Sequence, residues 1–141
     1  MFEKNYEERL EIWSNFRQGL ESSSTPFTDV ISFFSKAPKV GLHLDPWDKN
    51  TWPNPWEMIL ENKYCEFISV LGWLYSLQLT ERFSQSNFEI HIFTVQEKGY
   101  QYCLFVDDYV LGFSDEKELI RKIDIPKSYK PQEVYPMSGC Q

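Results

Sequence analysis

Cys65 is the residue of this chain whose type and position best suit covalent chemistry. It falls at the start of an apolar helical pattern, and a thiol at a helix N-terminus can have a lowered pKa that makes it a nucleophilic thiolate. An ordinary thiol is mostly protonated near neutral pH, so it needs a histidine to accept its proton and an acid to orient that histidine. Cys65 is followed in the chain by His91 and then by Asp107 and Asp108, an order in which a catalytic triad could be assembled.

A structural interpretation of the cysteines competes with the catalytic one. Cys65 is flanked by Tyr64 and Phe67, and apolar surroundings raise the pKa of a thiol. We therefore expect Cys65 to be a small buried apolar residue. Cys103, inside a predicted strand, is expected to lie in the core, whereas Cys140 near the end of the chain is expected to be exposed.

His43, Asp45 and Asp48 carry side chains of the types that bind metal ions. They lie in a loop-like stretch, however, and loop residues of these types more often cap turns. We therefore expect no metal ion and no other cofactor.

Aromatic residues are the second group of candidate binding residues, because they make up 17% of the chain and are enriched at the centres of interfaces. Three tryptophans fall in the proline-rich segment from Asp45 to Cys65. They could line a sugar- or peptide-binding groove, but we expect them to bury this segment against the fold or against another subunit. The residues expected to contact a partner are Trp47, Trp52, Trp56, Tyr129 and Tyr135.

The composition indicates one folded domain and argues against several functions. The 141 residues are enough for a domain with a core, and 42% of them are hydrophobic. The net charge of −7 disfavours nucleic-acid binding, which needs clustered basic residues. No run of about 18 apolar residues is present, and the charged N-terminus lacks an apolar signal segment, so we expect no membrane contact. Three cysteines in no paired pattern fit a reducing compartment.

Hydrophobic periodicity predicts the elements that must position these side chains. The predicted helices span residues 6–20, 26–36, 55–62 and about 64–80, the last of them apolar on most sides and therefore central. The predicted strands span residues 88–94, 100–106 and 109–113, joined by turns as an antiparallel meander. Alternation directs Ile90 and Ile92 to the core and His91 to the polar face. Ser114 is expected to cap a last short helix that ends at Lys122.

These elements predict an α+β fold, with N-terminal helices and a buried central helix packed on a small antiparallel sheet. We expect a single domain over residues 1–122, with its N-terminal helices within 5–36 and its core within 45–122. Residues 123–141 contain three prolines and little periodicity, so they are expected to form an extended C-terminal arm.

The chain resembles the bacterial transglutaminase-like cysteine proteinases, which belong to the wider group of transglutaminase-like and papain-like enzymes. The residues that carry the resemblance are Trp52, Pro55, Glu57, Leu60, Cys65 and Glu66, within a match that covers roughly residues 45–115. The resemblance implies a transglutaminase-like fold with the catalytic histidine at the start of the second strand and the aspartate on the third. Tyr102 and Gly112 stand at those positions here, so the resemblance implies a retained fold and a lost triad.

Small proteins of this type also occur among the virion proteins of tailed bacteriophages, which this sequence resembles in size and aromatic content. We therefore expect a non-enzymatic structural or assembly protein of a tail, neck or baseplate, assembled in the host cytoplasm. Its expected partners are other virion proteins in multiple copies. An active cysteine hydrolase or transamidase that uses Cys65, His91 and Asp107 or Asp108 is the alternative, and a cytosolic regulatory or inhibitor module is a third interpretation.

Overall fold

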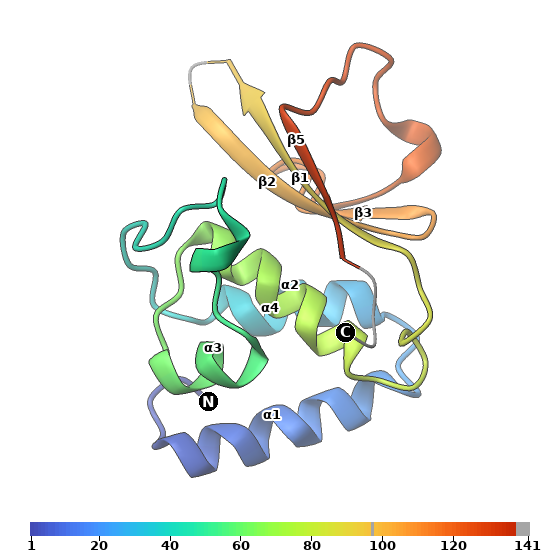
Figure 1. Ribbon diagram of the computed structural model, residues 1–141. Helices are drawn as coiled ribbons and strands as arrows, with labels where there is room; N and C mark the ends of the chain where they lie inside the picture. Colours follow the sequence, from blue (N-terminus) through green and yellow to red (C-terminus); the bar gives the residue numbers. More distant parts are fainter. Residues whose placement is uncertain (97, 138–141) are drawn as a thin grey trace.

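A computed structural model describes residues 1–96 and 98–137 of the protein (Figure 1). The described residues form an α+β fold, as predicted. The helices are α1 (Tyr6–Leu20), α2 (Pro26–Ser35), α3 (Pro55–Glu61) and α4 (Glu66–Gln78), with short 3₁₀ helices η1 (Lys49–Thr51) and η2 (Lys122–Asp124). The strands are β1 (Phe88–Val95), β2 (Gly99–Val106), β3 (Tyr109–Leu111), β4 (Leu119–Arg121) and β5 (Glu133–Pro136).

α4 is the central helix of the fold and lies between the sheet and α1 (Figure 1). Most of its side chains are buried, which confirms the predicted buried central helix. Gly72 allows α2 to approach α4 closely, because a Cβ at this position would lie only 2.8 Å from the ring of Phe34. On the opposite side, Trp13 of α1 donates an indole hydrogen bond of 2.9 Å to the Ser76 hydroxyl of α4.

The helices begin and end where local sequence signals place them. Asn54 and Glu57 form a reciprocal capping box with Pro55 at the first position of α3, and Asn62 ends this helix in the left-handed conformation. Arg9 of α1, which the periodicity places off the apolar stripe, is instead buried. Its guanidinium group donates to three backbone carbonyl groups, those of Lys4, Ile59 and Leu60, and so joins α1 to the end of α3.

The five strands form one antiparallel sheet in the order β4-β3-β2-β1-β5, which confirms the predicted meander of the three middle strands. Both faces of the sheet are covered. Phe88, Ile90 and Leu104 lie in the core shared with α4. Side chains on the opposite face form a second cluster under the chain that follows β3, and its members are Phe93, Cys103, Phe105 and Val110, with Phe113 and Tyr129 packed against them.

The prediction of a helix from Ser114 to Lys122 is wrong. The expected cap hydrogen bond does form, because the Ser114 hydroxyl accepts from the Lys117 N–H at 2.9 Å. The chain then continues as strand β4, which pairs with β3 and gives that strand a hydrogen-bonded neighbour on its outer side. Part of the expected C-terminal arm also joins the sheet, since β5 pairs with β1 and forms its other edge.

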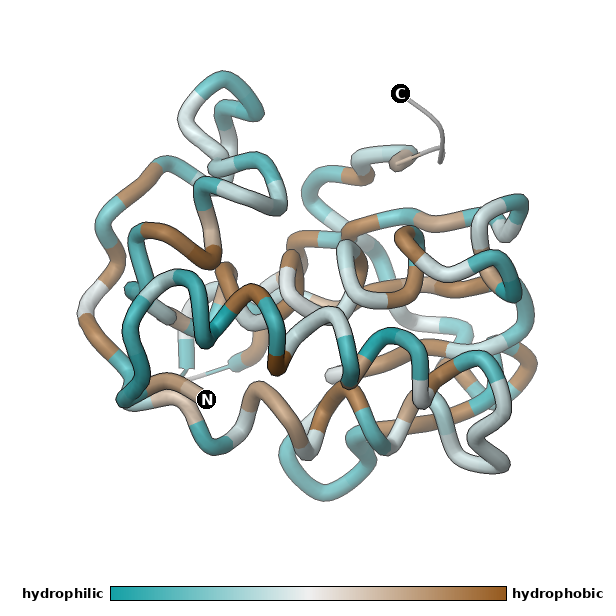
Figure 2. Tube along the Cα trace, turned by 90° about the horizontal axis from the view of Figure 1, so that it is seen from below, coloured by the Kyte–Doolittle hydropathy of each residue, from teal (hydrophilic) through white to brown (hydrophobic). Residues whose placement is uncertain are grey.

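Hydrophobic residues are distributed along the chain in short stretches that alternate with hydrophilic ones (Figure 2). This pattern is that of amphipathic elements around a shared core. Among the described residues, no helix is both long and apolar enough to cross a lipid bilayer.

Candidate functional site

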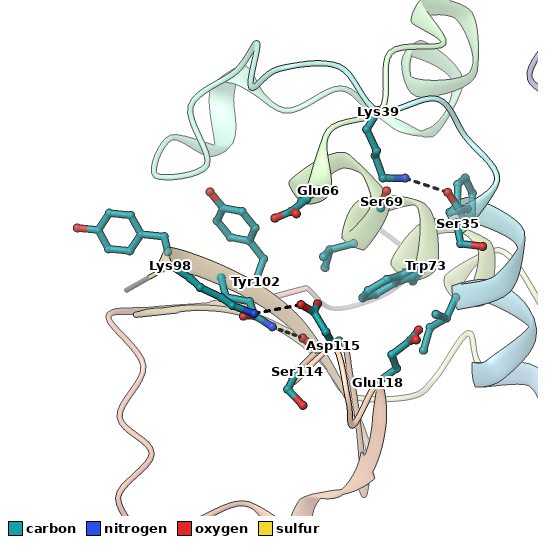
Figure 3. A pocket seen from close by; sticks show the side chains of 16 residues that line it. Ser35, Lys39, Glu66, Ser69, Trp73, Lys98, Tyr102, Ser114, Asp115 and Glu118 are labelled. Atoms are coloured by element: carbon teal, nitrogen blue, oxygen red, sulfur yellow. Dashed lines mark hydrogen bonds and ion pairs between the residues drawn. The ribbon is translucent and has the colours of Figure 1, made fainter. Parts of the chain in front are cut away.

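A pocket of about 620 Å³ lies beside the first half of α4, where β2 and β3 separate (Figure 3). Its walls come from α2, α4, β2 and the loop between β3 and β4. The polar and aromatic side chains around it include Lys39, Glu66, Ser69, Trp73, Lys98, Tyr100, Tyr102, Asp115 and Glu118. Tyr102 and Gly112, which stand where the resemblance predicted a histidine and an aspartate, line this pocket, whereas Cys65 does not.

Cys65 is the N-cap residue of α4, as the sequence predicted for the start of the central helix. Its side chain is only 4% exposed and belongs to the hydrophobic core. Its backbone carbonyl accepts hydrogen bonds from the N–H (3.0 Å) and the hydroxyl (3.3 Å) of Ser69. This environment is that of a structural thiol, and it offers a substrate little access to the sulfur.

Tyr102, at the position where the resemblance predicted a histidine, is close enough to Cys65 for a charge there to act on its hydroxyl. Burial raises the pKa of the Tyr102 hydroxyl, and the negative charges of ionised Cys65 and Glu66 raise it further. The hydroxyl therefore stays protonated near neutral pH and cannot accept a proton from the thiol. Burial lowers the pKa of the nearby Lys39 ammonium group, and the negative charges of Cys65 and Glu66 oppose that shift. The Lys39 ammonium group donates a hydrogen bond of 3.1 Å to the Phe34 carbonyl.

The structure does not bring His91 to Cys65. His91 lies on the face of the sheet opposite α4, stacked on Phe105 with ring centroids 3.8 Å apart. The strand alternation predicted that His91 lies on the polar face, and this prediction is wrong, because the His91 side chain is only 8% exposed. The chain that follows β3 covers this face and brings Tyr129 against the imidazole, so the second face of the sheet is an interior one.

His91 belongs to a polar cluster with Glu89, Tyr129 and Cys103, in which His91 and Cys103 are buried and the other two are partly exposed. Its Nε2 atom lies 3.0 Å from the Glu89 carboxylate, which can only accept, so Nε2–H donates and Nδ1 accepts from the Tyr129 hydroxyl at 2.8 Å. The Cys103 thiol and the Tyr129 hydroxyl are close enough to affect each other's pKa. Burial raises the pKa of Cys103 to about 12 and lowers that of His91, against the effect of Glu89. These shifts keep Cys103 protonated and His91 neutral, and they indicate a structural network.

Asp107 and Asp108 form the turn between β2 and β3 and are not near Cys65. The Asp107 carboxylate accepts from the Asn87 N–H at 2.9 Å, and its left-handed φ of 50° fits this tight turn. Both acids line a separate pocket with Phe27 and Arg82. The alternative triad of Cys65, His91 and Asp107 or Asp108 is therefore not assembled in the structure.

The five aromatic residues predicted to bind a partner fall into two groups. Trp47 and Trp56 are 41% and 47% exposed. Trp52, Tyr129 and Tyr135 are half-buried and hold the fold together: Trp52 packs edge-on against Tyr135, and its indole N–H donates to the Asp45 carbonyl at 3.2 Å.

The loop residues considered as metal ligands cap turns instead. The Asp45 and Asp48 carboxylates accept from the backbone N–H groups of Trp47 (2.9 Å) and Asn50 (3.0 Å), as expected for loop residues. His43 is exposed, with its Nδ1 atom 3.3 Å from the Gly41 carbonyl oxygen. Within residues 1–96 and 98–137, no three His, Cys, Asp or Glu side chains are grouped so as to hold a metal ion.

The sequence did not identify Trp73 as a residue of the site. It lies on α4 within an apolar run, but its indole faces Gly112 and lines the pocket. Its N–H has no hydrogen-bond partner among the described residues. A single sequence gives no sign that Trp73 meets Gly112, because the contact joins residues about 40 positions apart in the chain. Cys140 lies outside the described residues.

Comparisons of the chain with models of protein families, with curated proteins and with solved structures found no match.

Proposed function

We propose that this protein is a non-enzymatic structural or assembly component of a tailed-phage virion, in the tail, neck or baseplate, on a degenerate cysteine-proteinase-like fold. The observation that supports the loss of catalysis is the environment of Cys65. Cys65 occupies the N-cap position of the central helix without a side-chain cap hydrogen bond, Tyr102 stands where the resemblance implies a histidine, and His91 lies across the sheet. In this setting neither Tyr102 nor His91 can act as the base that would form the thiolate.

Two exposed aromatic groups support a role in assembly. Trp47 lies edge-on against Tyr100 with ring centroids 5.1 Å apart, and both side chains are substantially exposed. Trp56 lies against Trp13 of α1, and the guanidinium group of Arg17 covers the Trp13 ring at 4.4 Å. Tryptophan, tyrosine and arginine are the residues enriched at the energetic centres of interfaces.

The proposal is tested by mass spectrometry of purified particles of the phage whose genome encodes the chain. We expect the protein in the particles at a constant copy number, and we expect Cys65→Ala to leave that number unchanged. Its absence from particles, with the protein abundant in the infected cell, would contradict the proposal. Loss of a hydrolytic activity in Cys65→Ala would instead support the alternative of an active cysteine hydrolase.

A further inference from the structure

The first half of β2 is an open edge of the sheet. β3 pairs only with residues 104–106 of β2, so no described strand lies on that side of residues 99–103. The two-residue turn makes Val106 and Tyr109 a hydrogen-bonded pair, and backbone groups alternate in direction along a strand. Tyr100 and Tyr102 therefore direct their N–H and C=O groups toward this side, where Gly112 lies beside the carbonyl oxygen of Tyr102 but not beside Tyr100. A strand edge of this kind is a template for pairing with another chain.

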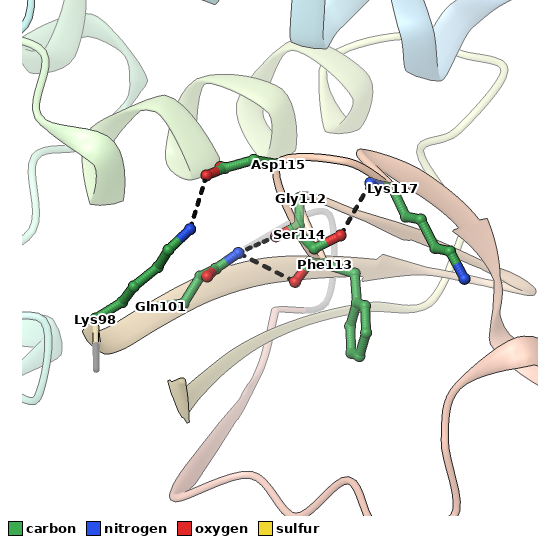
Figure 4. A network of polar contacts seen from close by, with 7 residues as sticks. All are labelled: Lys98, Gln101, Gly112, Phe113, Ser114, Asp115 and Lys117. Carbon is green, nitrogen blue, oxygen red and sulfur yellow. Dashed lines mark hydrogen bonds and ion pairs between the residues drawn. The ribbon is translucent and has the colours of Figure 1, made fainter. Parts of the chain in front are cut away.

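The loop after β3 holds this edge open. Gly112 leaves the strand with a φ of 81°, and the loop is connected to β2 through side chains (Figure 4). Gln101 donates its amide to the carbonyl oxygens of Gly112 (3.2 Å) and Phe113 (3.0 Å), and Lys98 pairs with Asp115 at 3.2 Å. The pocket lies between this loop, the edge of β2 and α4, so there is space beside the unpaired backbone groups (Figure 3).

The charges around the pocket favour a basic occupant. It is lined by the three carboxylates of Glu66, Asp115 and Glu118, and by the ammonium groups of Lys39 and Lys98. Lys98 is paired with Asp115, and Lys39 already donates to a backbone carbonyl. Glu66 and Glu118 are exposed, and their carboxylates have no hydrogen bond or ion pair to the described residues.

We infer that the edge of β2 at Tyr100 and Tyr102 binds an extended, basic peptide segment of a partner protein, which adds to the sheet as a strand. The backbone groups of the segment pair with the N–H and C=O of Tyr100 and with the N–H of Tyr102, and one lysine or arginine side chain reaches Glu66 or Glu118 in the pocket. The inference rests on the proposed assembly function, because it gives that function the chemical class of its partner. Tyr100, which is 53% exposed, and its neighbour Trp47 form the rim of the binding surface.

The test begins with a random twelve-residue peptide library that is selected on the purified full-length chain, followed by synthesis of the enriched peptides. Tyr100→Pro removes the outward N–H, and its matched control Tyr100→Ala removes the same side chain but keeps that N–H. We expect enriched peptides to contain lysine or arginine and to bind Tyr100→Pro at least tenfold more weakly than Tyr100→Ala, or about 1.4 kcal/mol. Amide exchange at Tyr100 and Tyr102 should slow when peptide is bound.

A second variant keeps the test valid if Tyr100→Pro does not fold. Glu66→Lys with Glu118→Lys changes two exposed side chains and should weaken binding of the basic peptides at least tenfold. The inference is overturned if no peptides are enriched, or if they bind these variants as tightly as they bind the controls. Binding is measured on the isolated chain, so this failure is distinct from absence of the protein from particles, which concerns the proposed function alone.

Discussion

The ring of Trp73 occupies the space that a side chain at position 112 would need. A Cβ on Gly112 would lie 2.7 Å from Cζ3 of Trp73, and the backbone of Gly112 has a φ of 81° that favours glycine. The position where the resemblance predicted an aspartate therefore has no room for a side chain unless Trp73 moves. The same contact marks the point where β3 leaves β2 and the pocket opens.

We expect Gly112→Ala to lower the free energy of unfolding by about 2–5 kcal/mol. A left-handed backbone costs a non-glycine residue about 1–2 kcal/mol, and overpacking against an indole adds about 1–3 kcal/mol. Gly19→Ala in α1 is the control, because no atom lies within 4 Å of its new Cβ and alanine favours a helix by up to about 1 kcal/mol. Urea denaturation measures the free energy of unfolding of both variants. Equal effects of Gly112→Ala and Gly19→Ala would contradict the close contact between Gly112 and Trp73.

The helices were predictable because their signals are local. Apolar spacing, a proline at the first position and an asparagine cap act within one or two turns, so the bounds of α1 and α3 agree closely with those predicted. The segment after β3 shows the limit of such signals. Ser114 caps a turn there, but pairing of Leu119–Arg121 with β3 and partial burial of Ile120 against the sheet outweigh the weak helical preference of a short polar segment.

The candidate site was predictable only in part. The position of Cys65 at the start of a buried helix follows from the hydrophobic pattern alone. The placement of His91 does not, because alternation along a strand defines two faces but does not reveal that the chain after β3 covers the second one. The contacts of the pocket join α4 to a loop far along the chain, and local periodicity carries no information about them.

Cys65 and Cys103 should both resist alkylation in the folded protein. Both thiols are buried, and the pKa of Cys103 is raised to about 12. Mass spectrometry after iodoacetamide treatment at neutral pH should show labelling of these two sites only in concentrated urea. Rapid labelling of native Cys65, lost in His91→Ala, would contradict the structural assignment, because it would show a thiolate paired with a base.

Stability should rise with pH across the titration of His91. Burial lowers its pKa in the folded protein and Lys122 adds to this, while Glu89 acts in the opposite direction. The unfolded chain, with a histidine pKa of about 6.5, therefore binds more protons between the folded pKa and that value. Stability is lost as pH falls below about 6.5 and levels off above it.

Urea denaturation between pH 5 and pH 8 measures how stability depends on pH, because this range extends to both sides of the free histidine pKa of about 6.5. His91→Gln removes the titrating group, so we expect the slope near pH 6 to decrease relative to the unchanged protein. His43→Gln is the matched control, because His43 is exposed and its substitution should leave the slope as it is. Equal slopes in the two variants would show that His91 does not titrate differently on folding.

Alanine substitutions of the exposed and the half-buried tryptophans should have different effects on assembly and on stability. Trp47→Ala and Trp56→Ala each remove one aromatic contact and should lower the free energy of unfolding by about 0.5–1.5 kcal/mol. Trp52→Ala removes contacts with Phe67 and Tyr135 and should cost about 2–3 kcal/mol, below the range for a fully buried tryptophan. Incorporation into particles should fall in the first two variants although they remain folded. If the Trp47→Ala and Trp56→Ala variants are both incorporated normally, the partner binds another surface. Removal of an aromatic ring from the centre of an interface would lower the affinity for the partner.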